Sequence, residues 1–263
     1  MIDARATEPV LEVREVHTRF GSTVVHRGVS LEVRRGEIFV LAGASGCGKS
    51  TLLREIIHLL RPDSGSIRLL GQEVVGLAEE EALTLRRRCG VMFERGALFG
   101  ALTVAENVGL PLREQTRLGD PLVEELAALK IALAGLPPEA ASRYPSQLSG
   151  GMRKRAALAR AIALDPEILF LDEPTAGLDP LSASGFDELV RHLKELLGPT
   201  IVIVSHDLDL LWRVADRVAF MSDGRVVGVG SMEELSRTEH PVLREYFDGP
   251  RGRGAREQSW KRR

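Results

Sequence analysis

One glycine-rich segment constrains the fold of this chain more than any other part of its sequence. Its residues are Gly43, Ala44, Ser45, Gly46, Cys47, Gly48, Lys49, Ser50 and Thr51. They fit the pattern Gly-x-x-x-x-Gly-Lys-Ser/Thr of a phosphate-binding loop, which needs a strand before it and a helix after it. The apolar run 38–42 predicts that strand, and residues 52–57 predict the helix. We therefore expect an α/β fold in which N–H groups at a helix N-terminus surround a phosphate.

Two side chains of this loop carry the expected chemistry. Lys49 is expected to neutralise oxygens of the β- and γ-phosphates, and Ser50 to offer its hydroxyl to Mg²⁺. The alternative is a chance glycine loop, which the flanking strand and helix disfavour.

Composition limits the remaining possibilities. The chain has 263 residues, 44% of them hydrophobic, which suits one large domain or one domain with an inserted lobe. A formal net charge of −2 argues against broad binding of nucleic acid. Cys47 and Cys89 show no metal-binding spacing, which suits a reducing cytosol. No signal peptide and no membrane-spanning run is visible, so any membrane role is expected to depend on a partner.

Periodicity predicts two kinds of strand and a helical insertion. Antiparallel strands are expected at 10–16, 24–25, 30–33 and 66–69. Continuous apolar strands, typical of a buried parallel sheet, are expected at 168–171 and 201–204, with a shorter one at 90–93. Between them, residues 103–133 show helical patterns that Gly109, Pro111 and Pro121 are expected to break. A hairpin is expected at 217–230 and a capping box at Ser231.

Two carboxylates follow the apolar strand at 168–171. Because ligands bind at the carboxyl ends of strands in α/β sheets, Asp172 and Glu173 are candidates for phosphoryl-transfer chemistry. Asp172 is expected to hold Mg²⁺ through water, and Glu173 to polarise a water aimed at the γ-phosphate. The alternative is a pair of acidic residues that only caps a helix.

A second predicted helix N-terminus has the features of an anion-binding site. Ser149, Gly150 and Gly151 precede a strongly helical segment, so Ser149 is expected to cap it and the glycines to leave N–H groups exposed. A second cradle implies another phosphate, or a nucleotide presented by another subunit. His206 follows the strand at 200–205 and is expected to contact a γ-phosphate.

In order and spacing, these motifs resemble those of the ATPase subunits of ABC transporters, over about residues 10–240. The resemblance implies a RecA-like P-loop core, an antiparallel β-subdomain and an inserted helical subdomain. It implies a head-to-tail homodimer with two ATP molecules, each held between one subunit's loop and the partner's residues 149–151. It also assigns Asp179, in the segment Ala176–Asp179, to the nucleotide site, and Phe20 to stacking on adenine. Ordinary core packing is the alternative for Phe20.

One residue departs from this family's pattern. A glutamine is expected after the strand at 90–93, next to Mg²⁺ and the attacking water, but Glu94 stands there. Glutamate still offers an oxygen to the ion, with added negative charge, so slower basal turnover is one expectation. A nearly silent variant is the other.

Further segments are similar to the MlaF-type ATPases of Mla/Mce phospholipid transport systems. They include Gly96–Phe99, Pro111–Glu114 and Ser149–Leu164. This resemblance implies an MlaE-like permease, a periplasmic MCE protein, a STAS-domain partner in some systems, and a cytoplasmic position on the bacterial inner membrane. The alternatives are the same ATPase on an amino-acid or organic-solute transporter, and a non-transport ABC ATPase. Phe99 is expected to face the permease or, alternatively, to pack inside the helical lobe.

The expected domain boundaries follow from these motifs. The ABC ATPase domain is expected at residues 8–245, with its helical subdomain at about 95–165. Residues 246–263 form a basic tail, for which three interpretations stand: disorder, a clamp on a partner through Trp260, or contact with anionic lipid.

Overall fold

The structure is a computed structural model, and it describes residues 9–248. The proposed roles of the tail therefore fall almost wholly outside the described residues. The described chain divides into two compact units. Unit 1 comprises residues 9–83 and 200–248, and unit 2 comprises residues 84–199. Helix α2 (Glu79–Arg87) spans the boundary between them.

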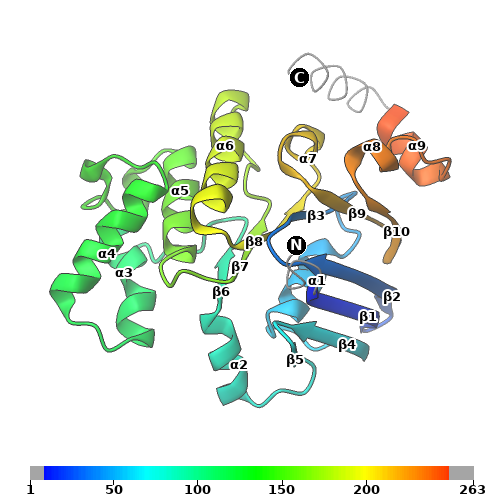
Figure 1. Cartoon of the computed structure of the whole chain (residues 1–263), viewed down its shortest axis with the longest axis horizontal. Helices are drawn as coiled ribbons and strands as arrows, with labels where there is room; N and C mark the ends of the chain where they lie inside the picture. Colours follow the sequence, from blue (N-terminus) through cyan, green and yellow to red (C-terminus); the bar gives the residue numbers. More distant parts are fainter. Residues whose placement is uncertain (1–8, 249–263) are drawn as a thin grey trace, which may run out of the picture. The chain divides into compact units, whose positions relative to one another are not determined.

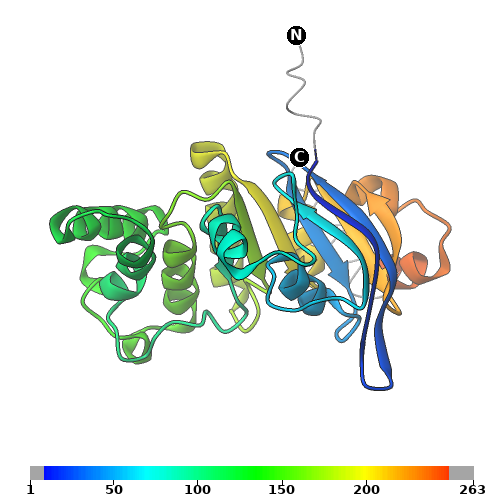
Figure 2. The ribbon, with the colours of Figure 1, turned by 90° about the horizontal axis from the view of Figure 1, so that it is seen from below.

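Unit 1 contains an antiparallel sheet with the strand order β2-β1-β4-β5. The strands are β1 (Pro9–Phe20), β2 (Thr23–Arg34), β4 (Ser64–Leu69) and β5 (Gln72–Glu73). Figure 2 shows β1 and β2 as a long antiparallel hairpin, in shades of blue. Leu11 and Val13 of β1 are buried and Glu12 between them is more exposed, as the predicted alternation requires, but a register shift between Val13 and Val16 interrupts the pattern.

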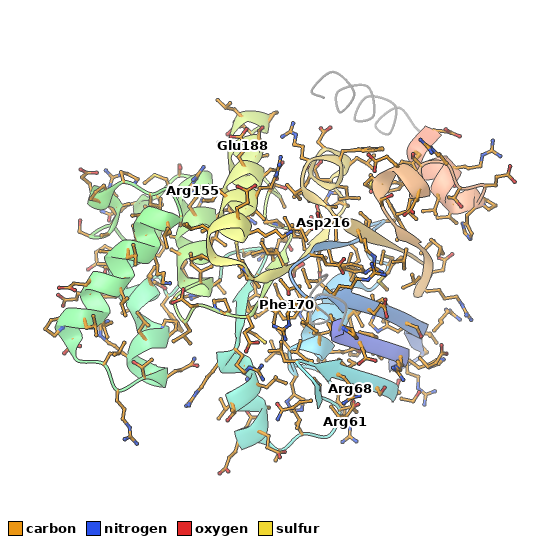
Figure 3. The ribbon with its side chains drawn as sticks, in the orientation of Figure 1. Arg61, Arg68, Arg155, Phe170, Glu188 and Asp216 are labelled. Atoms are coloured by element: carbon orange, nitrogen blue, oxygen red, sulfur yellow. The ribbon has the colours of Figure 1, made fainter. Side chains whose placement is uncertain are left out.

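The second sheet of unit 1 has the order β10-β9-β3-β8. Its strands are β3 (Ile38–Gly43), β8 (Thr200–Ser205), β9 (Arg217–Ser222) and β10 (Arg225–Gly230). β3 pairs in parallel with β8 and β9, and both β3 and β8 are buried throughout. The predicted hairpin of β9 and β10 is antiparallel. Asp216, labelled in Figure 3, fixes the start of β3 because its Oδ2 accepts from the Ile38 N–H at 2.7 Å.

Four helices complete unit 1 (Figure 1). They are α1 (Lys49–Ile56), α7 (Leu208–Val214), α8 (Met232–Leu235) and α9 (Pro241–Asp248). The capping box predicted at Ser231 is present, with Glu234 as the reciprocal partner. Helix α9 packs Tyr246 and Phe247 edge-on against Phe220 of β9, which places the last described helix on the sheet.

Unit 2 pairs two parallel strands with a long helix. The elements are β6 (Cys89–Met92), β7 (Ile168–Asp172) and α6 (Pro180–Leu197). β7 is buried along its whole length, and Phe170 at its centre, labelled in Figure 3, is fully buried. Arg88 bonds to Glu167 at 2.6 Å, which joins the residues that precede the two strands.

The helical part of unit 2 contains three main helices (Figure 1, green). They are α3 (Val104–Gln115), α4 (Asp120–Leu133) and α5 (Gly150–Ala161), with the 3-10 turns η2 (Pro138–Ala140) and η3 (Pro145–Gln147). Their core includes Val104, Val108 and Ile131.

The expectation that Gly109 and Pro111 break this region was wrong. Helix α3 runs through both residues, and the chain leaves helical structure only after Gln115. A proline inside a helix costs about 3 kcal/mol. Val104, Val108 and Leu112 are buried on the same helix, and each buried side chain contributes about 1.5–3 kcal/mol. Packing therefore outweighs the local preference. Pro121 instead lies in the first turn of α4, where proline is tolerated.

Candidate active site

The glycine-rich loop joins β3 to α1 in unit 1, as its sequence predicts. Gly43 ends the buried strand, and Gly48 is the N-cap of α1. Both have positive φ, and a Cβ atom on Gly43 would lie 2.2 Å from the carbonyl oxygen of Met221. A Cβ on Gly48 would lie 2.8 Å from Nε2 of His26. The chain's own packing therefore requires glycine at both positions.

The ammonium of Lys49 lies over the loop. Its Nζ donates to the carbonyl oxygens of Gly43 at 2.8 Å and Ala44 at 2.9 Å, and the residue is 5% exposed. Lys49 is also the first residue of α1, so the partial positive charge of the helix N-terminus adds to the charge of its side chain. The loop thus concentrates positive charge and N–H donors at one point, which suits a polyphosphate.

Phe20 ends β1 and is 52% exposed. This exposure excludes the alternative that Phe20 only packs in the core. An exposed aromatic face at the end of a strand remains compatible with stacking on a base.

In unit 2, the two carboxylates lie at the end of β7, as predicted. Asp172 is its last residue and is buried, and Glu173 follows with φ of 45°. This left-handed conformation costs a non-glycine residue about 1–2 kcal/mol. A lysine that the sequence reasoning missed holds it: Lys154 of α5 donates to the carbonyl oxygen of Glu173 at 2.8 Å.

The same lysine also reaches the residue that departs from the family pattern. Lys154 Nζ donates to the carbonyl oxygen of Glu94 at 2.5 Å. Burial lowers the pKa of Lys154 from its ordinary value, and the carboxylates of Glu94, Glu173 and Asp172 oppose that shift. One ammonium therefore links the backbones of the proposed general base and of Glu94.

Polar contacts also fix the segment after Glu94. The guanidinium of Arg160 donates to the carbonyls of Gly96 at 2.9 Å and Ala97 at 2.8 Å. Buried Asn107 bonds to both the N–H and the C=O of Phe99, at 2.8 and 3.1 Å. The Phe99 side chain is nevertheless 54% exposed, which excludes the alternative that it packs inside the helical lobe.

The second glycine pair begins α5, as expected. Ser149 caps the helix by accepting from the N–H of Met152 at 3.2 Å. A Cβ atom at Gly150 or Gly151 would meet its nearest neighbours, in Leu178 and Ser182, at an ordinary 3.8 Å. Asp179, beside them in sequence, caps α6, and the hydrogen bonds from Ser182 hold the pKa of its carboxyl below the ordinary value.

His206 follows β8 and is exposed. Its carbonyl oxygen accepts from the hydroxyl of Tyr246, a residue of α9, at 3.0 Å. The C-terminal helix thus anchors the peptide that carries this histidine, a contact that the sequence did not predict.

Within each unit, the structure brings some of the predicted residues together. In unit 1, Lys49 meets Gly43 and Ala44, and in unit 2 Glu94 and Glu173 share Lys154. The residues that sequence reasoning missed are charged or polar residues at buried positions of otherwise apolar segments. Glu55, which stands beside Leu52, Leu53 and Ile56 in α1, is one example that the sequence could have revealed.

Comparisons with known proteins agree with this architecture. The profile of the ABC transporter family matches residues 26–176. The intermembrane phospholipid transport system ATP-binding protein MlaF of Escherichia coli (strain K12) is 39% identical over 240 residues, 91% of this chain and 89% of that protein. The probable ribonucleotide transport ATP-binding protein mkl of Mycobacterium tuberculosis (strain ATCC 25618 / H37Rv) is 37% identical over 241 residues, 92% of this chain and 67% of that protein.

Solved structures give the same result. The dimeric ATP-binding cassette MJ0796, bound to ADP and Pi after hydrolysis, matches with a TM-score of 0.78 at 30% identity, covering 84% of this chain and 98% of that one. For cbiO1 of Clostridium perfringens, part of the ABC transporter complex cbiONQ, the TM-score is 0.79 at 28% identity, covering 95% and 99%. These matches confirm the predicted fold, an α/β P-loop ATPase. The chain therefore belongs to the ABC transporter family and is one of its ATP-hydrolysing cassettes.

Proposed function

We propose that this chain powers phospholipid transport between bacterial membranes, as the ATPase subunit on an MlaE-like permease. The observation that carries the proposal is the likeness to MlaF along nearly the whole length of both proteins. Within residues 9–248, no helix combines the length and apolar character that crossing a membrane requires. The proposal places the chain in the cytoplasm, on the inner face of the inner membrane.

The residues of the two units take distinct roles in this proposal. The N–H groups of residues 43–51 and the ammonium of Lys49 bind the phosphates of ATP, and Phe20 stacks on adenine. Glu173 orients the attacking water, and His206 contacts the γ-phosphate. Phosphoryl transfer depends mainly on positioning and charge neutralisation. The hydrogen bonds that hold Lys49 and the backbone of Glu173 in place therefore contribute directly to the chemistry.

The residues assigned to Mg²⁺ fit that ion by their chemistry. Ser50, Asp172 and Glu94 offer only oxygen ligands, and Mg²⁺ in nucleotide enzymes is held by one or two carboxylates together with phosphate oxygens. When bound, the ion neutralises charge that develops on the phosphates.

The second anion cradle is assigned to a partner copy. Ser149, Gly150, Gly151 and Asp179 of one subunit complete the nucleotide site of the other, in a homodimer. Support comes from the ordinary 3.8 Å contacts that a Cβ atom would make at either glycine, because the single chain then has no steric need for glycine there. The dimeric form of the MJ0796 cassette supports the same assignment.

Reconstitution tests the transported substrate. The chain is co-expressed with an MlaE-like permease from the same organism, and the complex is placed in liposomes that contain labelled phospholipid. ATP-dependent movement of the lipid, lost in Glu173→Gln, is the expected result. Movement of a labelled ribonucleotide with no movement of lipid would instead favour the activity named for mkl.

The same preparation tests the docking surface and the further partners. Phe99 is exposed on a loop that Asn107 and Arg160 hold rigidly, so Phe99→Asp is expected to weaken association with the permease and leave the fold intact. Exposed Leu129→Asp on α4 is the matched control. Mass spectrometry of the purified complex reports whether STAS-domain and MCE proteins accompany it.

A further inference from the structure

A buried polar cluster lies directly beneath the phosphate-binding loop. His26 of β2 and Glu55 of α1 are both almost completely buried, and so is Thr18 of β1. The ring of His26 bridges two elements: its Nε2 is 3.1 Å from the carbonyl oxygen of Gly48, and its Nδ1 is 3.1 Å from Oε2 of Glu55. Unpaired polar groups in a protein interior are costly, so the hydrogen bonds among these three side chains must be identified.

Hydrogen-bond chemistry limits where the protons are. A carbonyl oxygen only accepts, so Nε2 of His26 carries a proton and donates to Gly48. The hydroxyl of Thr18 is 2.6 Å from Oε1 of Glu55, and its Oγ1 is 3.1 Å from Nδ1 of His26. Thr18 has a single hydroxyl proton, which it donates to Oε1 of Glu55. The contact between Oε2 and Nδ1 therefore needs a proton from Glu55 or His26 itself.

The second oxygen of Glu55 requires that proton. Without it, Oε2 and Nδ1 would face each other at 3.1 Å with a lone pair on each, which is repulsive. With a proton on either atom, the same contact is a hydrogen bond. Among the described side chains, Oε2 of Glu55 has no other hydrogen-bond partner, so the contact with His26 is what compensates it.

We propose that His26, joined to Glu55 on one side and to Gly48 on the other, is a positioning residue that holds the phosphate-binding loop from beneath. The proposal rests on the assignment of residues 43–51 to phosphate binding. The bond from His26 fixes the Gly48 carbonyl, which also accepts from the N–H of Leu52 at 2.9 Å. Because the C=O and the following N–H of a trans peptide point in opposite directions, this bond turns the Lys49 N–H toward the ligand side.

The pair lies directly against the loop. The imidazole contacts Gly48, where a Cβ atom would meet Nε2 at 2.8 Å, and Glu55 lies on its other side. The cluster is a preorganised support for phosphate, separate from the residues that would touch it.

The first test reads the protonation state directly. The full chain is labelled with ¹⁵N at its histidine rings, and the His26 signals are assigned by their loss in His26→Leu/Glu55→Leu. Nε2 of His26 is expected to show the shift of a protonated nitrogen, because it donates to the Gly48 carbonyl. An unprotonated Nε2 would overturn the proposal. Unchanged signals from the other histidines show that the variant used for assignment is folded.

The second test measures the effect on binding. The double variant His26→Leu/Glu55→Leu replaces the polar pair with apolar side chains, a change that buried pairs often tolerate. Its affinity for ADP, measured by calorimetry, is expected to fall about tenfold, the loss associated with one hydrogen bond. His17→Leu, an exposed histidine of the same sheet, is the matched control and should bind as the parent chain does.

A third variant separates this proposal from the assignment of the loop. Lys49→Ala is expected to lose ADP binding if residues 43–51 bind phosphate. If Lys49→Ala binds normally, the loop assignment fails. If Lys49→Ala loses binding while the folded double variant binds ADP as tightly as the parent chain, the role of His26 fails and the loop assignment stands.

Discussion

The two glycine-containing helix starts of this protein differ in why they contain glycine. In unit 1, Gly43 and Gly48 have positive φ, and a Cβ atom on either would collide with groups of the same chain. In unit 2, Gly150 and Gly151 have neither constraint, and a Cβ would meet only ordinary contacts. The first pair is explained by the fold of one chain. For the second pair the fold of one chain gives no such reason, which is why we propose that it serves a nucleotide presented by a partner copy.

The side chains that support the two regions also differ. The loop of unit 1 rests on His26 and Glu55, a pair buried inside one unit. The strand end of unit 2 is held by Lys154 through two backbone carbonyls, which leaves the carboxylates of Glu94 and Glu173 outside that pair of bonds. Variants in unit 1 should therefore change binding, and variants in unit 2 should change turnover.

The largest effect is expected at Glu173. Glu173→Gln should keep ATP affinity and lower turnover by about 10²–10⁴-fold, the range for losing a general base. Steady-state ATPase rates beside equilibrium ATP binding check this outcome. Glu188→Gln, an exposed carboxylate on α6 that Figure 3 labels, is the control. Near-normal hydrolysis in Glu173→Gln would show that Glu173 is not the general base.

The glycine comparison predicts the next effect. Gly151→Asp should leave the monomer folded and able to bind ATP, yet prevent ATP-dependent dimerisation and lower turnover about 10²-fold, as for a lost donor to a transition-state oxygen. Gly48→Ala should instead lose nucleotide binding in the monomer. Light scattering with and without ATP, beside calorimetry, measures both. If Gly151→Asp loses affinity as a monomer, the two glycine pairs do not differ as described.

A smaller effect is expected at Lys154. Lys154→Met removes the donor that holds Glu173 in its left-handed conformation, so turnover should fall roughly tenfold to 100-fold while ATP affinity stays unchanged. Lys154→Arg should recover part of the rate because it retains the charge and the donors. Arg153→Met, an exposed neighbour on α5, serves as the control. A matched rise in Kd and fall in rate would point to general damage to unit 2 instead.

The smallest expected effect is on stability and concerns two capping boxes, one in each unit. Thr103 with Glu106 starts α3, and Ser231 with Glu234 starts α8. Hydrogen bonds from the threonine and the serine hold the pKa of each glutamate below its ordinary value of 4.5. A depressed folded-state pKa gives stability that is present above pH 4.5 and is lost as the pH falls through the lowered pKa.

Thermal unfolding from pH 7 to pH 3 tests this pair. Glu106→Gln and Glu234→Gln should each be slightly less stable than the parent chain at pH 7. The difference should shrink as the pH falls below 4.5, because protonation then weakens the parent box as well. A difference that stays constant with pH would assign the loss to packing rather than to charge.

Local sequence signals predicted the parts of this fold that depend on neighbours along the chain. The loop at 43–51, the apolar strands β7 and β8 and the capping box at Ser231 each follow from a few consecutive residues. Pro111 was misread because the burial of Val108 and Leu112 depends on which helices pack against α3. Lys154 and His26 were missed for a related reason: their partners lie far away in the sequence, so only packing reveals them.

The buried pair of His26 and Glu55 also restricts how this protein can evolve. Replacing either residue alone leaves its partner as an unpaired polar group in the interior, which commonly costs about 1–3 kcal/mol. A typical domain is stabilised by only roughly 5–15 kcal/mol, so that single step removes a sizeable part of it. Lineages that descend from this protein should therefore keep both residues or exchange both together. The two positions, 29 apart in the sequence, then behave as one inherited character.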